Sequence, residues 1–274
     1  MTLLKCLLYG FISGITEFLP VSSGAHQVLT CYLLGMSSRD PLLDFLVHIS
    51  VLLAVIIASR ESLLRFQHQQ KFHISRRKRR IIDSQSFYEL RLLKTATVPL
   101  FIGLLFSVIT QDLGSNLLVL VCFLILNAVI LLWAEHATRG NRDARTMSGL
   151  DGITMGLIGA FSVLPGISRT GIIASYATFR GADNHHAANW AVLLAIPALI
   201  FAVCFDLFYL ISSGLFSPSF STVIQYFFAV ISSFGGGYVG ISLFKFIINR
   251  SGFSGFAYYS FGVAIFTFIL YLIT

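Results

Sequence analysis

The sequence predicts an all-α polytopic membrane protein with a single membrane domain over residues 1–274. Hydrophobic residues make up 56% of the chain and charged residues only 11%, whereas a soluble domain carries about 25% charged residues. The apolar runs are continuous rather than alternating, which favours helices over a membrane β-barrel. Two apolar stretches are broken by a Leu-Pro step, at Pro20 and at Pro165, which indicates two helical hairpins.

The first hairpin is expected from two apolar runs, residues 3–19 and 21–34, that meet at Pro20. Proline lacks an N–H donor and disfavours helix at the residue before it. The second run is too short to cross a bilayer, which takes about 20 residues. We therefore expect a re-entrant hairpin that enters and leaves on one side. Its polar end must line a cavity or be buried in protein.

Six spans are expected besides the hairpins. They lie at residues 42–59, 95–110, 117–134, 187–211, 222–247 and 254–274, and the second hairpin lies at 152–164 and 167–179. Between the first two spans, residues 60–94 hold ten of the nineteen Lys and Arg residues, including Arg76-Arg-Lys-Arg-Arg80. We interpret this segment as a cytoplasmic basic loop that meets anionic lipid, and we do not expect a nucleic-acid partner. A shorter basic loop with Arg139, Arg142 and Arg145 falls on the same side.

The two halves of the chain, about residues 1–137 and 150–274, resemble each other. Gly10-Phe-Ile-Ser-Gly…Leu-Pro20-Val-Ser-Ser23 is similar to Gly156-Leu-Ile-Gly-Ala…Leu-Pro165-Gly-Ile-Ser168. Each half has one hairpin and three spans, and because three is odd the second copy is inverted. An inverted-topology repeat with broken helices places a binding site between the breaks. A chance match of two Leu-Pro hairpins is the alternative.

Residues 17–26, here called the first tip, concentrate polar groups between apolar runs. They include Glu17, Ser22, Ser23 and His26. A carboxylate at bilayer depth costs about 2.5–3.5 kcal/mol on insertion scales, so it indicates function. His26 follows Ser23 by three residues, a spacing that lets an imidazole act as general acid or base beside a hydroxyl. A helix-packing histidine is the alternative.

Residues 164–171, the second tip, contain a cation within a long apolar region. Arg169 needs an anionic partner there, and its planar fork suits phosphate. Gly166 and Gly171 permit close backbone approach. A structural ion pair between Glu17 and Arg169 is one reading. The four hydroxyls of the two tips, on Ser22, Ser23, Ser168 and Thr170, favour an oxyanion site with a nucleophile or a metal.

Other polar residues inside the apolar runs carry weaker expectations. Asp44 and His48 lie one helical turn apart near the outer end of their span. They form either a hydrogen-bonded pair or a second layer behind the site or a metal. Asp206 is expected near the outer interface. The four cysteines have no metal-binding spacing, so we expect buried, inert thiols at Cys6, Cys31, Cys122 and Cys204.

At these residues the chain resembles the undecaprenyl-pyrophosphate phosphatase family, integral membrane enzymes associated with bacitracin resistance. Thr16-Glu-Phe-Leu-Pro-Val-Ser-Ser23 with His26 is similar to the first family motif, and Pro165-Gly-Ile-Ser-Arg-Thr-Gly171 to the second. Asp44-Phe-Leu-Val-His48, Leu193-Leu-Ala-Ile-Pro197 and Phe256-Ala-Tyr-Tyr259 resemble further family segments. The resemblance covers nearly the whole length.

The resemblance implies hydrolysis of the terminal phosphate of undecaprenyl diphosphate, which recycles the lipid carrier for cell-wall synthesis. It implies a divalent cation, Mg²⁺ or Ca²⁺, and a site on the outer face of the bacterial plasma membrane. Glu17 would be an acidic group or metal ligand, Ser23 a nucleophile and His26 an acid or base. Arg169 and Ser168 would hold the diphosphate. Membrane lipids and a second copy of the chain, as a homodimer, are the candidate partners.

The chain departs from the family pattern close to the site. Ser13 stands where an acidic residue or Gln is usual, four positions before Glu17, and Ile173 stands where a hydroxyl residue is usual. Ser13 thus removes an expected carboxylate and leaves a hydroxyl behind the site. Two other functions stay open at this point, a prenyl-phosphate flippase or transporter and a non-catalytic binder of lipid diphosphates.

Overall fold

The computed structural model describes residues 2–36, 40–74, 84–138, 140–213 and 220–273. Within these ranges the regular structure is helical, apart from one isolated bridge between Arg142 and Ala182. Five described helices are long and apolar enough to cross a membrane. They are α3 (Pro41–Ala58), α7 (Leu117–His136), α10 (Asn184–Ser213), α11 (Phe220–Ser251) and α12 (Ser254–Ile273). The predicted class of all-α polytopic membrane protein is confirmed.

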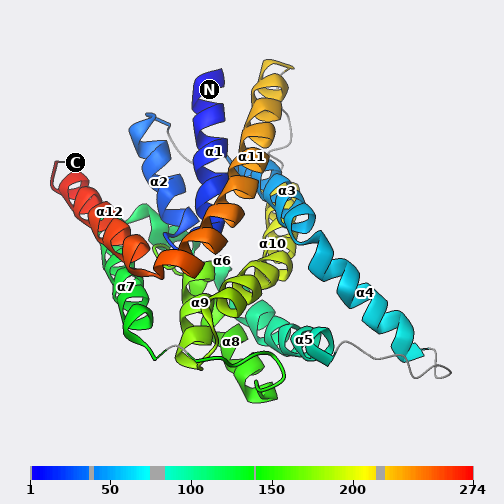
Figure 1. Ribbon diagram of the computed structural model, residues 1–274. Coiled ribbons are helices and arrows are strands. Elements are labelled where there is room, and N and C mark those ends of the chain that lie inside the picture. Colours follow the sequence, from blue (N-terminus) through cyan, green and yellow to red (C-terminus); the bar gives the residue numbers. More distant parts are fainter. Residues whose placement is uncertain (1, 37–39, 75–83, 139, 214–219, 274) are drawn as a thin grey trace.

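Two helical hairpins form where the Leu-Pro steps predict them. The first is α1 (Leu3–Phe18) and α2 (Ser23–Leu33), and the second is α8 (Gly149–Ala160), the short 3₁₀ helix η2 (Phe161–Val163) and α9 (Arg169–Phe179). Figure 1 shows α1 and α2 in the upper half of the bundle and α8 and α9 in the lower half. The tips meet in the middle, where Ser168 Oγ donates a hydrogen bond of 3.1 Å to the Leu19 carbonyl. Entry from opposite sides agrees with an inverted arrangement, and the internal repeat itself stays a prediction.

The expected span at 95–110 is not a single helix in the structure. The chain instead forms α5 (Ser84–Leu104), α6 (Ser107–Thr110) and the 3₁₀ helix η1 (Gln111–Ser115). Leu92, Leu93 and Ala96 are buried in the core, so the helix begins well before the apolar segment and ends inside it. Because the first half of α5 is charged, α5 is not one of the five apolar helices named above.

The expected basic loop at 60–94 is also largely helical. The helix α4 (Arg60–Ile74) follows α3 directly, and residues 84–94 belong to α5. Phe66 is 7% exposed, so the basic segment carries an apolar side chain that packs on the core and favours a helix. Arg76–Arg80, Arg139 and most of the turn at 37–41 lie outside the described residues.

Small residues let the hairpins pack closely against the spans. The helix α1 packs against α11, α8 against α5, and α12 against α7. A Cβ at Gly14 would collide with the Ser233 carbonyl of α11, and one at Gly156 would collide with the Ala96 carbonyl of α5. Backbones in contact hold the two tips at a fixed depth in the bundle.

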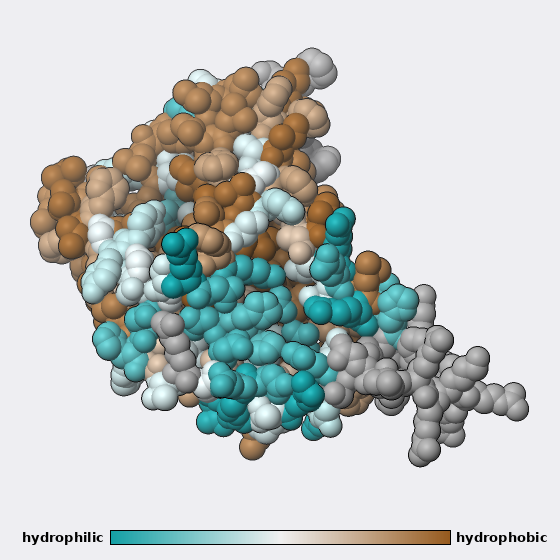
Figure 2. Space-filling view, in the orientation of Figure 1, coloured by the Kyte–Doolittle hydropathy of each residue, from teal (hydrophilic) through white to brown (hydrophobic). Residues whose placement is uncertain are grey.

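The outer surface matches a lipid environment. Figure 2 shows hydrophobic residues over the upper part of this face and hydrophilic residues gathered below, around the ends of α8 and α9. Large apolar side chains such as Trp133, Phe208 and Ile265 are well exposed on the spans. The expectation of four buried cysteines is wrong for Cys122 and Cys204, which are exposed, whereas Cys6 and Cys31 are buried. An apolar thiol on a lipid-facing helix surface needs no burial in protein.

Candidate active site

The tips of the two hairpins meet beside a cavity of about 1220 Å³. The first tip contributes Glu17, Ser22 and Ser23 to its wall, and the second contributes Ser168 and Arg169. The helices α3 and α10 supply the rest of the charged wall with Asp44, His48 and Asp206. The structure thus brings together groups from both halves of the chain.

Glu17 and Arg169 form an ion pair across the two tips. Arg169 Nη2 donates to Glu17 Oε1, and the side chains are 12% and 6% exposed for Arg169 and Glu17. A guanidinium carries five N–H donors, and Nε of Arg169 has no hydrogen-bond partner among the described residues. The ion pair therefore leaves part of the donor capacity of Arg169 unused, at a buried atom of a residue that lines the cavity. Because the pair is almost fully buried, removing one partner leaves an uncompensated charge.

Both tips also start a helix that points its N-terminus at the cavity. Ser22 caps α2 by accepting from the Ala25 amide, and Ser168 caps α9 by accepting from the Gly171 amide at 3.2 Å. Ser23 and Arg169, the first residues of these helices, line the cavity. The positive ends of two helix dipoles beside a guanidinium favour a polyanion such as a diphosphate.

Ser22 and Ser23 have different structural roles. Ser22 adopts a positive φ of 69°, and its Oγ accepts a hydrogen bond of 3.1 Å from the Gly166 amide of the other tip. Ser22 therefore joins the hairpins. The hydroxyl of Ser23, half-buried in the cavity wall, makes no hydrogen bond with any described residue. Ser23 is the hydroxyl that is free to meet a ligand.

Three of the predicted binding residues support the tips from behind. Thr170 is fully buried and its hydroxyl lies 3.2 Å from Ser168 Oγ. Gly166 has a φ of 106° and packs on α7, where a Cβ would come within 2.7 Å of Phe123. Gly171 packs on Pro20, and a Cβ added at Gly171 would lie only 2.9 Å from the Pro20 Cβ. None of the three lies in the described cavity wall.

His26 faces away from the cavity. Its Nδ1 lies 2.8 Å from the Ser22 carbonyl, and its Nε2 lies 2.8 Å from the Tyr259 hydroxyl of α12. Both ring nitrogens are thus used, and His26 does not line the cavity among the described residues. The packing alternative of the sequence fits this placement, and a role as acid or base toward Ser23 stays a prediction.

Asp44 and His48 line the cavity but bond to different partners. The Tyr9 hydroxyl donates to Asp44 Oδ1, while His48 Nδ1 lies 2.6 Å from Asp206 Oδ2 of α10. Asp206 therefore belongs to the cavity wall, and its expected place near the outer interface stays a prediction. The side chains of His48 and Asp206 are 20% and 18% exposed.

Comparison with known proteins identifies the family. The family model described as "Bacitracin resistance protein BacA" matches residues 6–266. This chain belongs to the BacA family. It is 31% identical over 263 residues to an undecaprenyl-diphosphatase of Carboxydothermus hydrogenoformans, with 94% of each chain covered. It is 30% identical over 272 residues to one of Thermodesulfovibrio yellowstonii, with 98% of this chain and 97% of the relative covered.

The BacA resemblance implies a divalent cation, and Glu17 is the carboxylate that fits it. The Ser13 hydroxyl, one turn away on α1, is buried and has no partner among the described residues. In the described part of the chain, no three metal-binding side chains converge around Glu17. Mg²⁺ is commonly held by one or two carboxylates together with substrate phosphates, so Glu17, which is buried and paired with Arg169, would hold a cation only together with a phosphate in the cavity.

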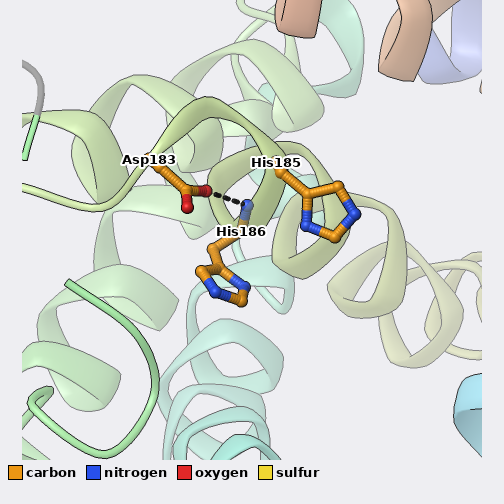
Figure 3. Close-up of side chains that lie close together, drawn as sticks. All are labelled: Asp183, His185 and His186. Carbon is orange, nitrogen blue, oxygen red and sulfur yellow. Dashed lines mark hydrogen bonds between the residues drawn. The ribbon is translucent and has the colours of Figure 1, made fainter. Parts of the chain in front are cut away.

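A group of three potential ligands does occur elsewhere, at Asp183, His185 and His186 before and within the first turn of α10. Figure 3 shows the two imidazoles pointing in different directions, with the Asp183 carboxylate accepting from the His186 backbone amide at 2.7 Å. His186 stacks on Trp190. Such contacts are typical of the first turn of a helix. The group also lies roughly 30 Å along α10 from Asp206, and therefore away from the cavity beside the hairpin tips.

Asn127 is the residue of the site that sequence reasoning missed. Its Nδ2 donates to the Pro20 carbonyl at 3.1 Å and to Ser260 Oγ at 3.2 Å, and its Oδ1 accepts from the Ser168 amide at 2.9 Å. Asn127 thus holds both tips from α7. A lone buried amide in the apolar run Leu117–His136 was the signal that could have found it.

Proposed function

We propose that this BacA family member is an undecaprenyl-diphosphate phosphatase, which removes the terminal phosphate of the lipid carrier. The observation that carries the proposal is the buried Glu17–Arg169 pair at a cavity onto which two helix N-termini point. Phosphoryl transfer needs mainly positioning and charge stabilisation, and these groups supply both. The relatives named above are undecaprenyl-diphosphatases.

The wall of the cavity suits a substrate with a charged head and an apolar tail. Ala198, Phe201 and Phe205 of α10 give the cavity an apolar side. A prenyl chain that lies along this side would place its diphosphate at Arg169. The cavity wall also includes Ser115 and Asn116 before α7, at the end of the bundle remote from Arg142 and Arg145. By the positive-inside rule, that end faces the outside of a bacterial plasma membrane.

The residues of the site divide the chemistry among them. Arg169 binds the phosphate oxygens, and the amides at the starts of α2 and α9 stabilise charge that develops on them. Ser23 is the hydroxyl placed to attack the terminal phosphorus, with water as the rival nucleophile. Glu17 orients Arg169 and would hold a divalent cation, which neutralises phosphate charge when bound.

Phosphate release tests the proposal directly. Purified protein in detergent is given undecaprenyl diphosphate or farnesyl diphosphate, with and without EDTA, while free phosphate is measured. We expect release that EDTA abolishes and Mg²⁺ or Ca²⁺ restores. Arg169→Lys should lower kcat/KM by about 100-fold, because a point charge replaces a bidentate fork. Arg145→Lys, at an exposed position outside the cavity, is the matched control.

The other functions predict different results. Movement of labelled lipid across liposomes without hydrolysis would support a flippase, and binding without either would support a passive binder. No phosphate release under any cation contradicts the enzyme. Full activity in Arg169→Ala contradicts the site. The candidate homodimer stays a prediction, tested by the mass of the purified particle in detergent.

A further inference from the structure

The cavity contains a histidine held in the geometry of an acid–base group. His48 of α3 lines the cavity, and its Nδ1 lies 2.6 Å from Asp206 Oδ2 of α10. Its Nε2 has no hydrogen-bond partner among the described residues, and the side chain is 20% exposed. A carboxylate on one ring nitrogen fixes the tautomer and orientation of an imidazole and leaves the other nitrogen for proton transfer.

The histidine of the first tip lacks these properties. His26 bonds through Nδ1 to a backbone carbonyl and through Nε2 to Tyr259, and it lies outside the described cavity wall. Using His26 as an acid would require breaking the Tyr259 contact and turning the ring. In this geometry His26 supports the strained Ser22, whereas His48 faces the space that a substrate would occupy.

Several charged groups share the cavity wall with His48. Three carboxylates line the same cavity as His48, namely Asp206 of α10, Glu17 of α1 and Asp44 of its own helix. Glu17 is balanced by Arg169, and Tyr9 of α1 donates to Asp44. The helix α11 also packs on α3, and the hydroxyl of Ser233 in α11 forms a hydrogen bond with the hydroxyl of Ser50 in α3. An imidazolium here adds a second cation to a cavity whose carboxylates would otherwise repel a diphosphate.

We infer that His48 is the general acid of the phosphatase reaction and that Asp206 is its positioning residue. The inference rests on the proposed function. As the bridging bond to the terminal phosphorus breaks, its electron pair stays on the bridging oxygen of the prenyl phosphate. His48 Nε2 gives its proton to that oxygen. The attacking oxygen, from Ser23 or water, bonds to phosphorus and releases its proton to solvent. If Ser23 attacks, a water molecule then attacks the phosphoserine phosphorus, which releases phosphate and restores the Ser23 hydroxyl. His48 then regains a proton from water.

The pH dependence of kcat tests the assignment. An acid must be protonated to act, so wild-type kcat should fall at alkaline pH as His48 loses its proton. In His48→Gln, kcat should drop by about 100-fold, and the alkaline fall should disappear from the residual activity. In Asp206→Asn, the fall should move to lower pH, because the carboxylate no longer favours the imidazolium.

Two other histidines serve as comparisons. His26→Gln should keep the alkaline fall while lowering thermal stability, since it removes a support of the first tip. His136→Gln, at the far end of α7, should match the wild type in kcat and in pH profile. Melting temperatures in detergent show that each variant is folded. If His48→Gln does not fold, the Asp206→Asn profile decides.

Each outcome separates this inference from the proposed function. No phosphate release by the wild type refutes the phosphatase, and this inference falls with it. Wild-type hydrolysis with an unchanged profile in His48→Gln or in Asp206→Asn overturns the role of His48 alone. Loss of activity in His48→Gln with the alkaline fall retained shows a purely structural ion pair and also overturns it. Disappearance of the fall in His26→Gln assigns the acid to His26.

Discussion

At the scale of single residues, the two adjacent serines of the first tip should respond differently to the same change. Ser23→Ala removes a hydroxyl that bonds to no described residue, so we expect an unchanged melting temperature. If Ser23 attacks phosphorus, kcat should fall by about 100-fold or more, because a covalent route is lost. Activity assays and thermal unfolding in detergent measure both quantities.

Ser22→Ala is the variant to compare with Ser23→Ala. Ser22 Oγ accepts from the Gly166 amide at 3.1 Å, and its loss orphans that donor between the tips. An unsatisfied buried group costs about 1–3 kcal/mol, so Ser22→Ala should lower the melting temperature while Ser23→Ala does not. Full activity in Ser23→Ala together with inactivity in folded Ser22→Ala would reverse the assignment. Full activity in both variants would favour water as the nucleophile.

At the scale of elements, Asn127 should control how the two hairpins meet. Asn127→Leu removes the partners of the Pro20 carbonyl and the Ser168 amide, which belong to different tips. We expect a loss of about 1–3 kcal/mol for each orphaned group, and a fall in kcat because both tips lose their common support. Thermal unfolding and phosphate release measure the two effects.

A second asparagine of the same helix provides the control. Asn116 caps α7 by accepting from the amides of Leu118 and Val119, and it contacts no tip residue through the bonds described. Asn116→Ala should cost about 1 kcal/mol, as for other N-caps, and should lower kcat far less than Asn127→Leu, because Asn116 lines the cavity but holds neither tip. Equal effects of the two substitutions would show that Asn127 acts only on the helix, and not on the junction of the hairpins.

The elements also show what the sequence could reveal. The ends of α1 at Phe18 and of η2 at Val163, just before the two Leu-Pro steps, follow from proline chemistry, which is local. The helices in 60–94 were missed because charge dominates that segment, while a few side chains such as Phe66 and Leu92 decide its packing. The partners of His48 and Asn127 were beyond reach, since Asp206 lies 158 positions from His48 and Pro20 lies 107 from Asn127. A periodic pattern identifies a buried face but not the helix that covers it.

At the scale of the whole molecule, the two ends of the bundle differ in polarity and charge. Arg142 and Arg180 lie together at one end, where Arg142 Nη1 donates to the Arg180 carbonyl and Arg180 pairs with Asp151. Figure 2 shows hydrophilic residues gathered at this end. The cavity wall reaches Ser115 and Asn116 at the start of α7, and α7 separates the two ends by roughly 30 Å, close to the thickness of a bilayer core.

The orientation of the cavity can be tested with two single cysteines in a background that lacks the four native ones. Ser115→Cys lies at the cavity end, and Thr146→Cys lies at the basic end; both positions are exposed. With an impermeant maleimide on intact cells, we expect labelling of Ser115→Cys alone, and of Thr146→Cys only after permeabilisation, because basic loops stay in the cytoplasm. Farnesyl diphosphate should slow labelling of Ser115→Cys if it fills the cavity. The opposite labelling pattern would place the site on the cytoplasmic side of the membrane.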